Sequence, residues 1–388
     1  MRFSMVALAA LSGALSLASA APAPDPPTPV VERTLPSTTA SDKTIFSPPT
    51  DANWTNPRVL YARAIELSSG ALLATWENYS PEPPLVHFPI YQSLDGGLTW
   101  SEIGQVHDTQ NGWGLRYQPF LYELPQRIAN YPKGTVLLAG NSIPTDLSLT
   151  KIDIYASRDG GFTWEFVSNV ASGGEALPIN GLTPIWEPFL MVYDSELICY
   201  YSDQRDENYG QKLVHTTTRN LHNWTTLIDD VHDDSAYAAR PGMPAVAQLP
   251  DGNWIFAYEA CGTDGCRVHY RLGANPLDML NAGSYTVVSD QGTYPVSSPY
   301  VVWSSVGGGN GALILSCGTN ANLFVNRKLG DPDSWVEYAI DQPKAYSRGL
   351  MLYNEDDTML MAIGAGHLPP SDTNYVSNSV VDLDALGI

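Results

Sequence analysis

Short apolar runs that end at Gly, Asn, Asp or Pro recur along this chain, and they favour strands over helices. One pattern returns six times: an apolar strand, a turn, and a second apolar strand that ends in aromatic or polar residues. The copies start 50 to 69 residues apart, at Arg63–Glu77, Gln118–Asn141, Glu187–Asp203, Met243–Glu259, Ser298–Gly318 and Arg348–Gly364. Six such hairpins predict an all-β fold, a six-bladed β-propeller with four strands in each blade.

A second repeat lies between the hairpins. Ser93–Trp100 reads SLDGGLTW and Ser157–Trp164 reads SRDGGFTW, and weaker versions occupy Thr217–Thr225 and Asn326–Trp335. The Asp can accept backbone N–H groups across a turn, and glycines permit left-handed dihedral angles. We expect these turns to join the two outer strands of a blade, with the Asp as a structural staple remote from any chemistry.

The N-terminus has the pattern of an exported protein. Residues 1–20 combine Arg2, an apolar run and Ala18-Ser19-Ala20, which together predict a cleaved signal peptide. Residues 21–42 are rich in Pro, Ser and Thr and predict an extended lead-in. The short strand Lys43–Ser47 is then expected to complete the sixth blade, so that 43–388 forms a single propeller domain without an open sheet edge.

The composition suits a secreted, monomeric protein with a neutral ligand. Lys plus Arg is 20 against 41 for Asp plus Glu, a net charge of -21, which argues against nucleic acid or an anionic membrane surface as a partner. No metal-ligand spacing appears among the Cys and His residues, and we expect no metal or cofactor.

Two kinds of covalent modification are expected. Cys261 and Cys266 bracket a turn, which predicts a local disulfide. Asn53, Asn78 and Asn223 begin N-glycosylation sequons.

Polar positions gather where the hairpins begin and end. Because a hairpin doubles back, its first and last residues lie at the same end of the propeller axis. The first residues are Arg63, Gln118, Glu187, Met243, Ser298 and Arg348, and the last are Glu77, Asn141, Ser202, Glu259, Gly318 and Gly364. A polar ring at one mouth of the axis predicts a ligand pocket there.

Glu187 and Glu259 are the leading catalytic candidates. Both have aromatic and apolar neighbours in sequence, which can raise a carboxyl pKa, and they come from adjacent blades. Two facing carboxyls are the minimum for glycoside hydrolysis, one to protonate the leaving oxygen and one to attack or to activate water. The alternative interpretation is that each Glu only bonds a neighbouring strand or an Arg.

Other mouth residues are candidates for substrate binding. Glu77 occupies the Glu259 position in blade 1 and is the rival carboxylate, while Gln118 and Asp203 extend the polar ring. Arginines can orient carboxylates or sugar hydroxyls, and aromatic rings can stack on sugars, although blade packing is the simpler role for the rings. The candidates are Arg63, Arg116, Arg240 and Arg348, with Trp113, Tyr117, Trp186, Tyr258 and Tyr346.

The chain resembles glycoside hydrolase family 93, the fungal exo-1,5-α-L-arabinanases of the sialidase superfamily. The similarity rests on the two Asp turns, on PIWEPFL around Glu187, on ARPGMP (Ala239–Pro244) and on FAYEACG around Glu259. It implies a retaining propeller enzyme that releases arabinobiose from the non-reducing end of plant cell-wall arabinan. By the same resemblance, Glu187 corresponds to the acid/base and Glu259 to the nucleophile.

Two other functions stay open. A sialidase would use arginines such as Arg63 and Arg348 on a sialate carboxylate, but no Arg-Ile-Pro motif is present. A non-catalytic carbohydrate-binding propeller would keep the aromatic mouth without needing Glu187.

Overall fold

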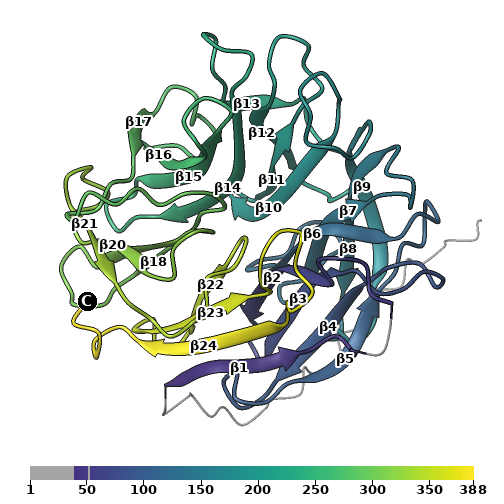
Figure 1. Ribbon diagram of the computed structural model, residues 1–388, viewed down its shortest axis with the longest axis horizontal. Coiled ribbons are helices and arrows are strands. Elements are labelled where there is room, and N and C mark those ends of the chain that lie inside the picture. The colour runs from purple at the N-terminus through teal and green to yellow at the C-terminus, as the bar shows by residue number, and fades with distance from the viewer. Residues whose placement is uncertain (1–38, 51–52) are drawn as a thin grey trace, which may run out of the picture.

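The chain forms a ring of six antiparallel sheets around a central axis (Figure 1), in a computed structural model that describes residues 39–50 and 53–388. Each sheet has four strands, which follow the sequence order in five sheets, while the sixth combines β22, β23 and β24 with β1; the described residues contain no helix. The predicted six-bladed propeller is therefore confirmed.

The blades are numbered from the N-terminus, with each innermost strand given first. Blades 1 to 3 are β2 (Val59–Glu66), β3 (Leu72–Asn78), β4 (Phe88–Ser93) and β5 (Ser101–Val106); β6 (Leu115–Glu123), β7 (Val136–Ser142), β8 (Thr150–Ser157) and β9 (Glu165–Gly173); β10 (Ile185–Tyr193), β11 (Glu196–Asp203), β12 (Lys212–Thr218) and β13 (Ile228–Val231). Blades 4 to 6 are β14 (Arg240–Gln248), β15 (Trp254–Cys261), β16 (Arg267–Gly273) and β17 (Gly283–Thr286); β18 (Tyr300–Ser304), β19 (Ala312–Ser316), β20 (Leu323–Asn326) and β21 (Trp335–Tyr338); β22 (Gly349–Leu352), β23 (Met359–Gly364), β24 (Val376–Asp382) and β1 (Ala40–Phe46).

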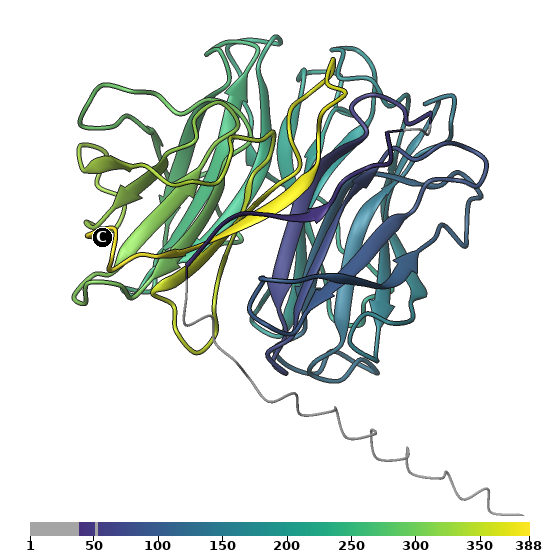
Figure 2. The same cartoon turned by 60° about the horizontal axis from the view of Figure 1, so that its bottom comes forward.

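Both ends of the described chain build blade 6. Strand β1 pairs with β24, with Lys43 opposite Asn378 and Phe46 opposite Val376, and the two strands run side by side in Figures 1 and 2. The strand begins at Ala40, three residues before the expected start. The signal peptide expected at 1–20 and most of the lead-in lie outside the described residues.

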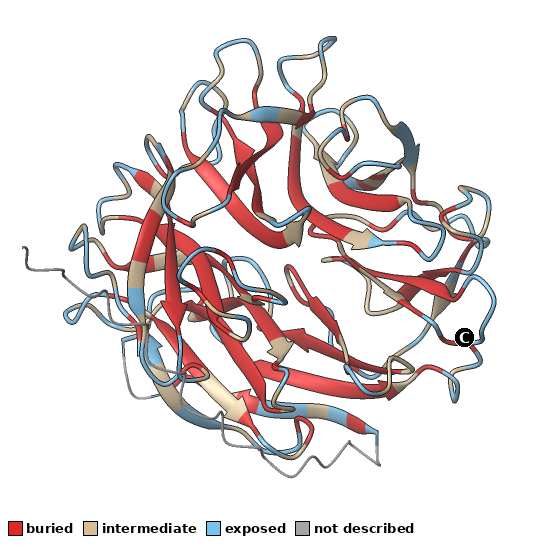
Figure 3. Ribbon diagram, turned by 180° about the vertical axis from the view of Figure 1, so that it is seen from behind, coloured by how far each residue is buried: buried red, intermediate tan, exposed pale blue. Residues whose placement is uncertain are grey.

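Burial follows position within the blade (Figure 3). Inner strands such as β3 and β7 are buried at every residue, because neighbouring blades cover both of their faces. The outermost strand β5 is largely exposed or half-buried. This explains why the inner hairpins read as nearly continuous apolar runs in the sequence.

The two Asp turns are staples at the end of the blades opposite the carboxylates described below. The Thr99 N–H and hydroxyl donate to the two oxygens of Asp95, at 2.9 Å and 2.5 Å, and the Trp100 indole N–H donates to the Gly97 carbonyl. Asp159 repeats these contacts with Thr163. These hydrogen bonds agree with the structural role predicted for the two turns.

A β-bulge interrupts the innermost strand at the mouth of blades 1 to 4. The first bulged residue adopts a left-handed φ, and blades 5 and 6 have left-handed residues just before β18 and β22. Such a φ is uncommon for residues other than glycine, and it turns the backbone N–H toward the axis. The six residues are Tyr61, Gln118, Glu187, Met243, Ser298 and Ser347.

The predicted covalent features have mixed outcomes. Cys261 and Cys266 form the expected disulfide. Asn53 and Asn223 are exposed, as a glycan acceptor requires, whereas Asn78 is only 7% exposed at the end of β3. A glycan has no room at Asn78, so the prediction for that sequon is not supported. Within the described ranges, no helix is long and apolar enough to cross a membrane.

Candidate active site

Three glutamates converge where the innermost hairpins meet at one mouth of the axis. Glu187 lies on the bulge of β10, Glu259 near the end of β15, and Glu77 near the end of β3. A Cβ built on Gly242 would lie 3.2 Å from Glu259 Oε1 and 3.3 Å from Glu187 Oε2, so these two oxygens are at most about 6.5 Å apart, the sum of the two distances. The two carboxylates predicted as a pair therefore face each other across Gly242.

Glu187 is held by strong hydrogen bonds. The Ser202 hydroxyl and the Met243 backbone N–H donate to its Oε2, at 2.6 Å and 2.7 Å. Burial raises its pKa, while these two donors and the nearby positive charge of Arg240 act in the opposite direction. These bonds favour the ionised form of Glu187.

Glu259 is held from the next blade. The Ser298 backbone N–H and the Ser297 hydroxyl donate to Oε2, at 2.7 Å and 3.0 Å, which leaves Oε1 facing Gly242. Burial, followed by the negative charge of Glu187, raises the pKa of Glu259 to about 7. Both carboxyls of this buried pair therefore have raised pKa values, and the charge of one disfavours ionisation of the other.

Glu77 is the third acid of the mouth. It accepts the Tyr79 hydroxyl at 2.7 Å and the Gln118 N–H at 2.9 Å. Burial raises its pKa to about 7. The Gln118 side chain in turn accepts the Glu187 N–H at 3.0 Å, so Glu77 and Gln118 support the bulge that carries Glu187.

Arg240 lies beside the pair. Burial lowers the pKa of its guanidinium, and the negative charges of Glu187 and Glu259 act in the opposite direction. Its guanidinium donates to Asn180 Oδ1, Gln204 Oε1 and Gln211 Oε1. The Trp186 indole N–H donates to the same Gln204 oxygen at 2.9 Å. Arg240, Trp186 and Gln118 thus lie around the carboxylates.

Two arginines expected to bind substrate are structural instead. The Arg63 guanidinium donates to the carbonyls of Ala62 and Ser347 and to the Ser347 hydroxyl. Arg348 is fully buried and donates to the carbonyls of Ala321, Gln342 and Asn322. These donors are used within the protein, so the prediction that Arg63 and Arg348 bind substrate is not supported.

A shift in register explains the error. The bulges make Tyr61 the counterpart of Glu187 in blade 1, two residues before Arg63. In blade 6 the left-handed residue is Ser347, one before Arg348. Tyr61 was missed because a tyrosine gives no sequence signal for a left-handed bulge.

The aromatic candidates divide into two groups. The Tyr346 ring lies 6.4 Å from that of Tyr61, and Tyr117 lies between Tyr79 and Trp186, at 6.0 Å and 6.4 Å between ring centroids. These rings surround the carboxylates and can contact a sugar. Tyr61 and Tyr79 join them as residues that the sequence pattern did not single out.

The second group lies away from the carboxylates. Tyr258 lines the space between blades 3 and 4, on the face of β15 opposite Glu259. Trp113 packs against Lys151 over the outer part of blade 2. Asp203 is tied to Arg205, and Arg116 is tied to Glu82. No described contact brings these residues to Glu187 or Glu259.

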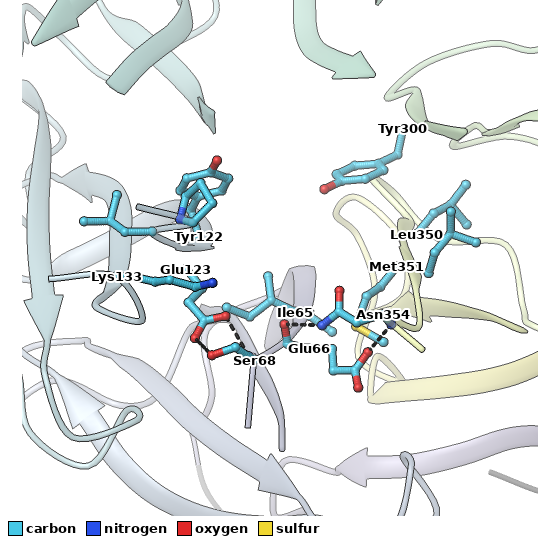
Figure 4. A pocket seen from close by; sticks show the side chains of 14 residues that line it. Ile65, Glu66, Ser68, Tyr122, Glu123, Lys133, Tyr300, Leu350, Met351 and Asn354 are labelled. Atoms are coloured by element: carbon cyan, nitrogen blue, oxygen red, sulfur yellow. Dashed lines mark hydrogen bonds between the residues drawn. The ribbon is translucent and has the colours of Figure 1, made fainter. Parts of the chain in front are cut away.

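A cavity of about 560 Å³ opens at the opposite end of the axis (Figure 4). Ser68, Glu123 and Asn354 line it, and Glu123 is already bonded to Ser68. Tyr300 also lines it, and the Arg63 guanidinium packs between Tyr300 and Tyr61, 5.2 Å and 3.9 Å from the ring centroids. This cavity is separated from the carboxylate mouth by that stack.

A six-bladed propeller with two facing, buried glutamates has the chemical groups of a glycoside hydrolase. Neither a protein-family model nor a curated protein sequence matches the chain. Among solved structures, it is 54% identical to the family 93 α-L-arabinofuranosidase of Fusarium graminearum, described in complexes with an iminosugar inhibitor and with arabinobiose. That match covers 90% of this chain and 99% of the other, with a TM-score of 0.88.

A second close match is the α-L-arabinanase of Penicillium chrysogenum complexed with arabinobiose. The identity is 51%, the coverage 89% and 99%, and the TM-score 0.87. The NanB sialidase of Streptococcus pneumoniae, 12% identical over 90% of this chain and 72% of that one, has a TM-score of 0.56 and shares the fold alone. The chain belongs to glycoside hydrolase family 93.

Proposed function

We propose that this protein is a secreted, monomeric, retaining exo-glycosidase that cleaves α-1,5-linked L-arabinan from the non-reducing end and releases arabinobiose. The observation that carries the proposal is the Glu187–Glu259 pair facing across Gly242. The two relatives described with arabinobiose support the choice of sugar. The bound of about 6.5 Å between the facing oxygens includes the separation of about 5–5.5 Å expected of retaining pairs, and the choice of retention follows the family resemblance.

The roles within the pair follow the family resemblance. Glu187 is proposed as the acid/base, which protonates the glycosidic oxygen as the C–O bond breaks. Glu259 is proposed as the nucleophile, which attacks the anomeric carbon and forms a glycosyl ester. Glu187, now ionised, then removes a proton from water, which attacks the same carbon and releases Glu259. The proton returns to Glu187, so each cycle consumes one water molecule.

The mouth suits a neutral sugar better than a sialate. Arg63 and Arg348, the arginines considered for a sialate carboxylate, use their donors on backbone carbonyls. The ring of Tyr61, Tyr79, Tyr117, Trp186 and Tyr346 offers apolar faces and hydroxyls to a furanose instead. The low charge of arabinan also fits the net charge of -21.

Digestion of linear 1,5-α-L-arabinan tests the proposal. We expect arabinobiose as the main product from the first minutes, with the polymer shortened only from its ends. Release of sialic acid from a sialoside, or binding of arabinan without hydrolysis, would overturn it in favour of a sialidase or a non-catalytic propeller. A Glu187→Gln variant identifies a non-catalytic propeller, because such a protein would bind arabinan equally well with and without this substitution.

A further inference from the structure

A groove of about 520 Å³ lies between blades 3 and 4. All four strands of blade 4 contribute to one wall, through Arg240 on β14, Tyr258 on β15, His269 on β16 and Ser284 on β17. Since these strands follow one another from the innermost to the outermost, the groove runs outward from the axis to the rim. Its volume is within the range of ordinary ligand sites.

The inner end of the groove lies at Arg240, beside the two carboxylates. In the β14–β15 ladder, Gly242 is opposite Glu259, while the next pair, Pro241 and Ala260, lines the groove from the other face of the sheet. Arg240 completes this inner end, and both carboxylates act on its guanidinium. A molecule held between Glu187 and Glu259 can therefore continue into the groove past Arg240.

The chemistry of the walls suits a neutral polyhydroxylated chain. The Tyr258 and Ser284 hydroxyls are 3.4 Å apart, a weak contact that sugar hydroxyls can replace. His269 Nε2 lies 2.7 Å from the Asp264 carboxylate, and the far wall adds His232 and Asp234. Acidic and basic groups alternate, so the groove has no single sign of charge that would select a polyanion.

We propose that this groove binds the leaving end of the substrate, the arabinofuranose units on the reducing-end side of the scissile bond. This inference rests on the proposed exo-arabinanase function. An enzyme that releases a disaccharide keeps the short end near the axis and must direct the long end to solvent. A groove that starts at Arg240, beside the carboxylates, and opens at the rim, where Ser284 and Asp234 are exposed, meets that need.

The test blocks the outer end of the groove with Ser284→Trp. Ser284 is exposed on the outermost strand, so the fold should tolerate the change. His269→Ala is a second variant that removes a wall instead of filling the space. Ser101→Trp is the matched control, since Ser101 is also exposed on an outermost strand, in blade 1. Each is assayed on linear arabinan and on an aryl arabinobioside, whose small leaving group does not extend to His269 and Ser284.

We expect Ser284→Trp to lower kcat/KM on the polymer by about tenfold, equivalent to about 1.4 kcal/mol, mainly through KM. His269→Ala should act in the same direction, and the control should match the wild type. On the aryl arabinobioside, all variants should remain within about twofold of the wild type. Equal activities of Ser284→Trp and the control on the polymer would overturn the groove assignment, as would an equal loss on both substrates. A wild-type enzyme inactive on both substrates would refute the proposed function instead.

Discussion

Replacing Gly242 with alanine is a sharp test of the carboxylate geometry, because it inserts one methyl group between the two glutamates. The new carbon would lie 3.0 Å from Gln211 Nε2, 3.2 Å from Glu259 Oε1 and 3.3 Å from Glu187 Oε2. Ordinary contacts with carbon begin near 3.5 Å, so each carboxylate must move by roughly 0.2–0.3 Å. Gly242 is not among the residues with a left-handed φ, and the backbone therefore accepts alanine.

The expected loss is catalytic. A displacement of 1 Å can cost about 100-fold in rate, and here both reacting groups move while the space between them shrinks, so we expect kcat/KM to fall by about 10- to 100-fold. Overpacking should lower the free energy of unfolding by about 1–3 kcal/mol. The assays are kcat/KM on an aryl arabinobioside and the thermal midpoint by circular dichroism.

Gly349→Ala is the matched control. Its new carbon would lie 3.1 Å from Ile363 Cγ2 and 3.3 Å from the Ala62 carbonyl oxygen, a similar steric demand without a carboxylate. It should lose similar stability but keep kcat/KM within about twofold. If Gly242→Ala retains wild-type kcat/KM, or if both variants lose activity equally, the carboxylates facing Gly242 are not the reacting pair.

Two further predictions concern stability. Asp95→Ala and Asp159→Ala each remove hydrogen bonds to a charged acceptor. Each should lower the free energy of unfolding, measured by urea titration, by about 2 kcal/mol while kcat is unchanged. A loss of turnover without a change in the urea midpoint would contradict the structural role of these turns. Burial raises the pKa values of Glu77 and Glu259 to about 7, so their contribution to stability is fully present below the ordinary value of 4.5 and is lost as the pH rises through about 7. The thermal midpoint should therefore decrease as the pH is raised from about 5 to about 8, and Glu77→Gln should make this decrease smaller. An equal decrease in the variant and the wild type would show that Glu77 does not contribute to the pH dependence of stability.

The sequence was sufficient for the fold and for the convergence of Glu187 and Glu259 at one mouth. The inner hairpins are buried on both faces, so their apolar runs repeat strongly enough to count blades. Glu187 and Glu259 could be found because each ends or begins a hairpin, and those positions meet at one mouth. The N-terminal strand was recognised from its apolar residues, but its start at Ala40 has no such signal.

The substrate-binding residues were harder to predict, for a physical reason. Each bulge adds residues at the mouth, and the left-handed positions are occupied by Tyr, Gln, Glu, Met and Ser, none of which marks a bulge in a sequence. An error of two residues selected Arg63 instead of Tyr61. For Tyr258, the alternation of side chains along β15 sends it to the face opposite Glu259.

The most direct test of the central claim combines Glu187→Ala and Glu259→Ala with azide and an aryl arabinobioside. If Glu259 is the nucleophile, its loss prevents the glycosyl ester, and azide attacks directly to give a glycosyl azide of inverted configuration. If Glu187 is the acid/base, its loss leaves the ester intermediate to react with azide, and the product retains its configuration. We predict inversion for Glu259→Ala and retention for Glu187→Ala, read from the anomeric NMR signals. The swapped result would reverse the roles within the same site, and near-normal hydrolysis of arabinan by either variant would contradict the account.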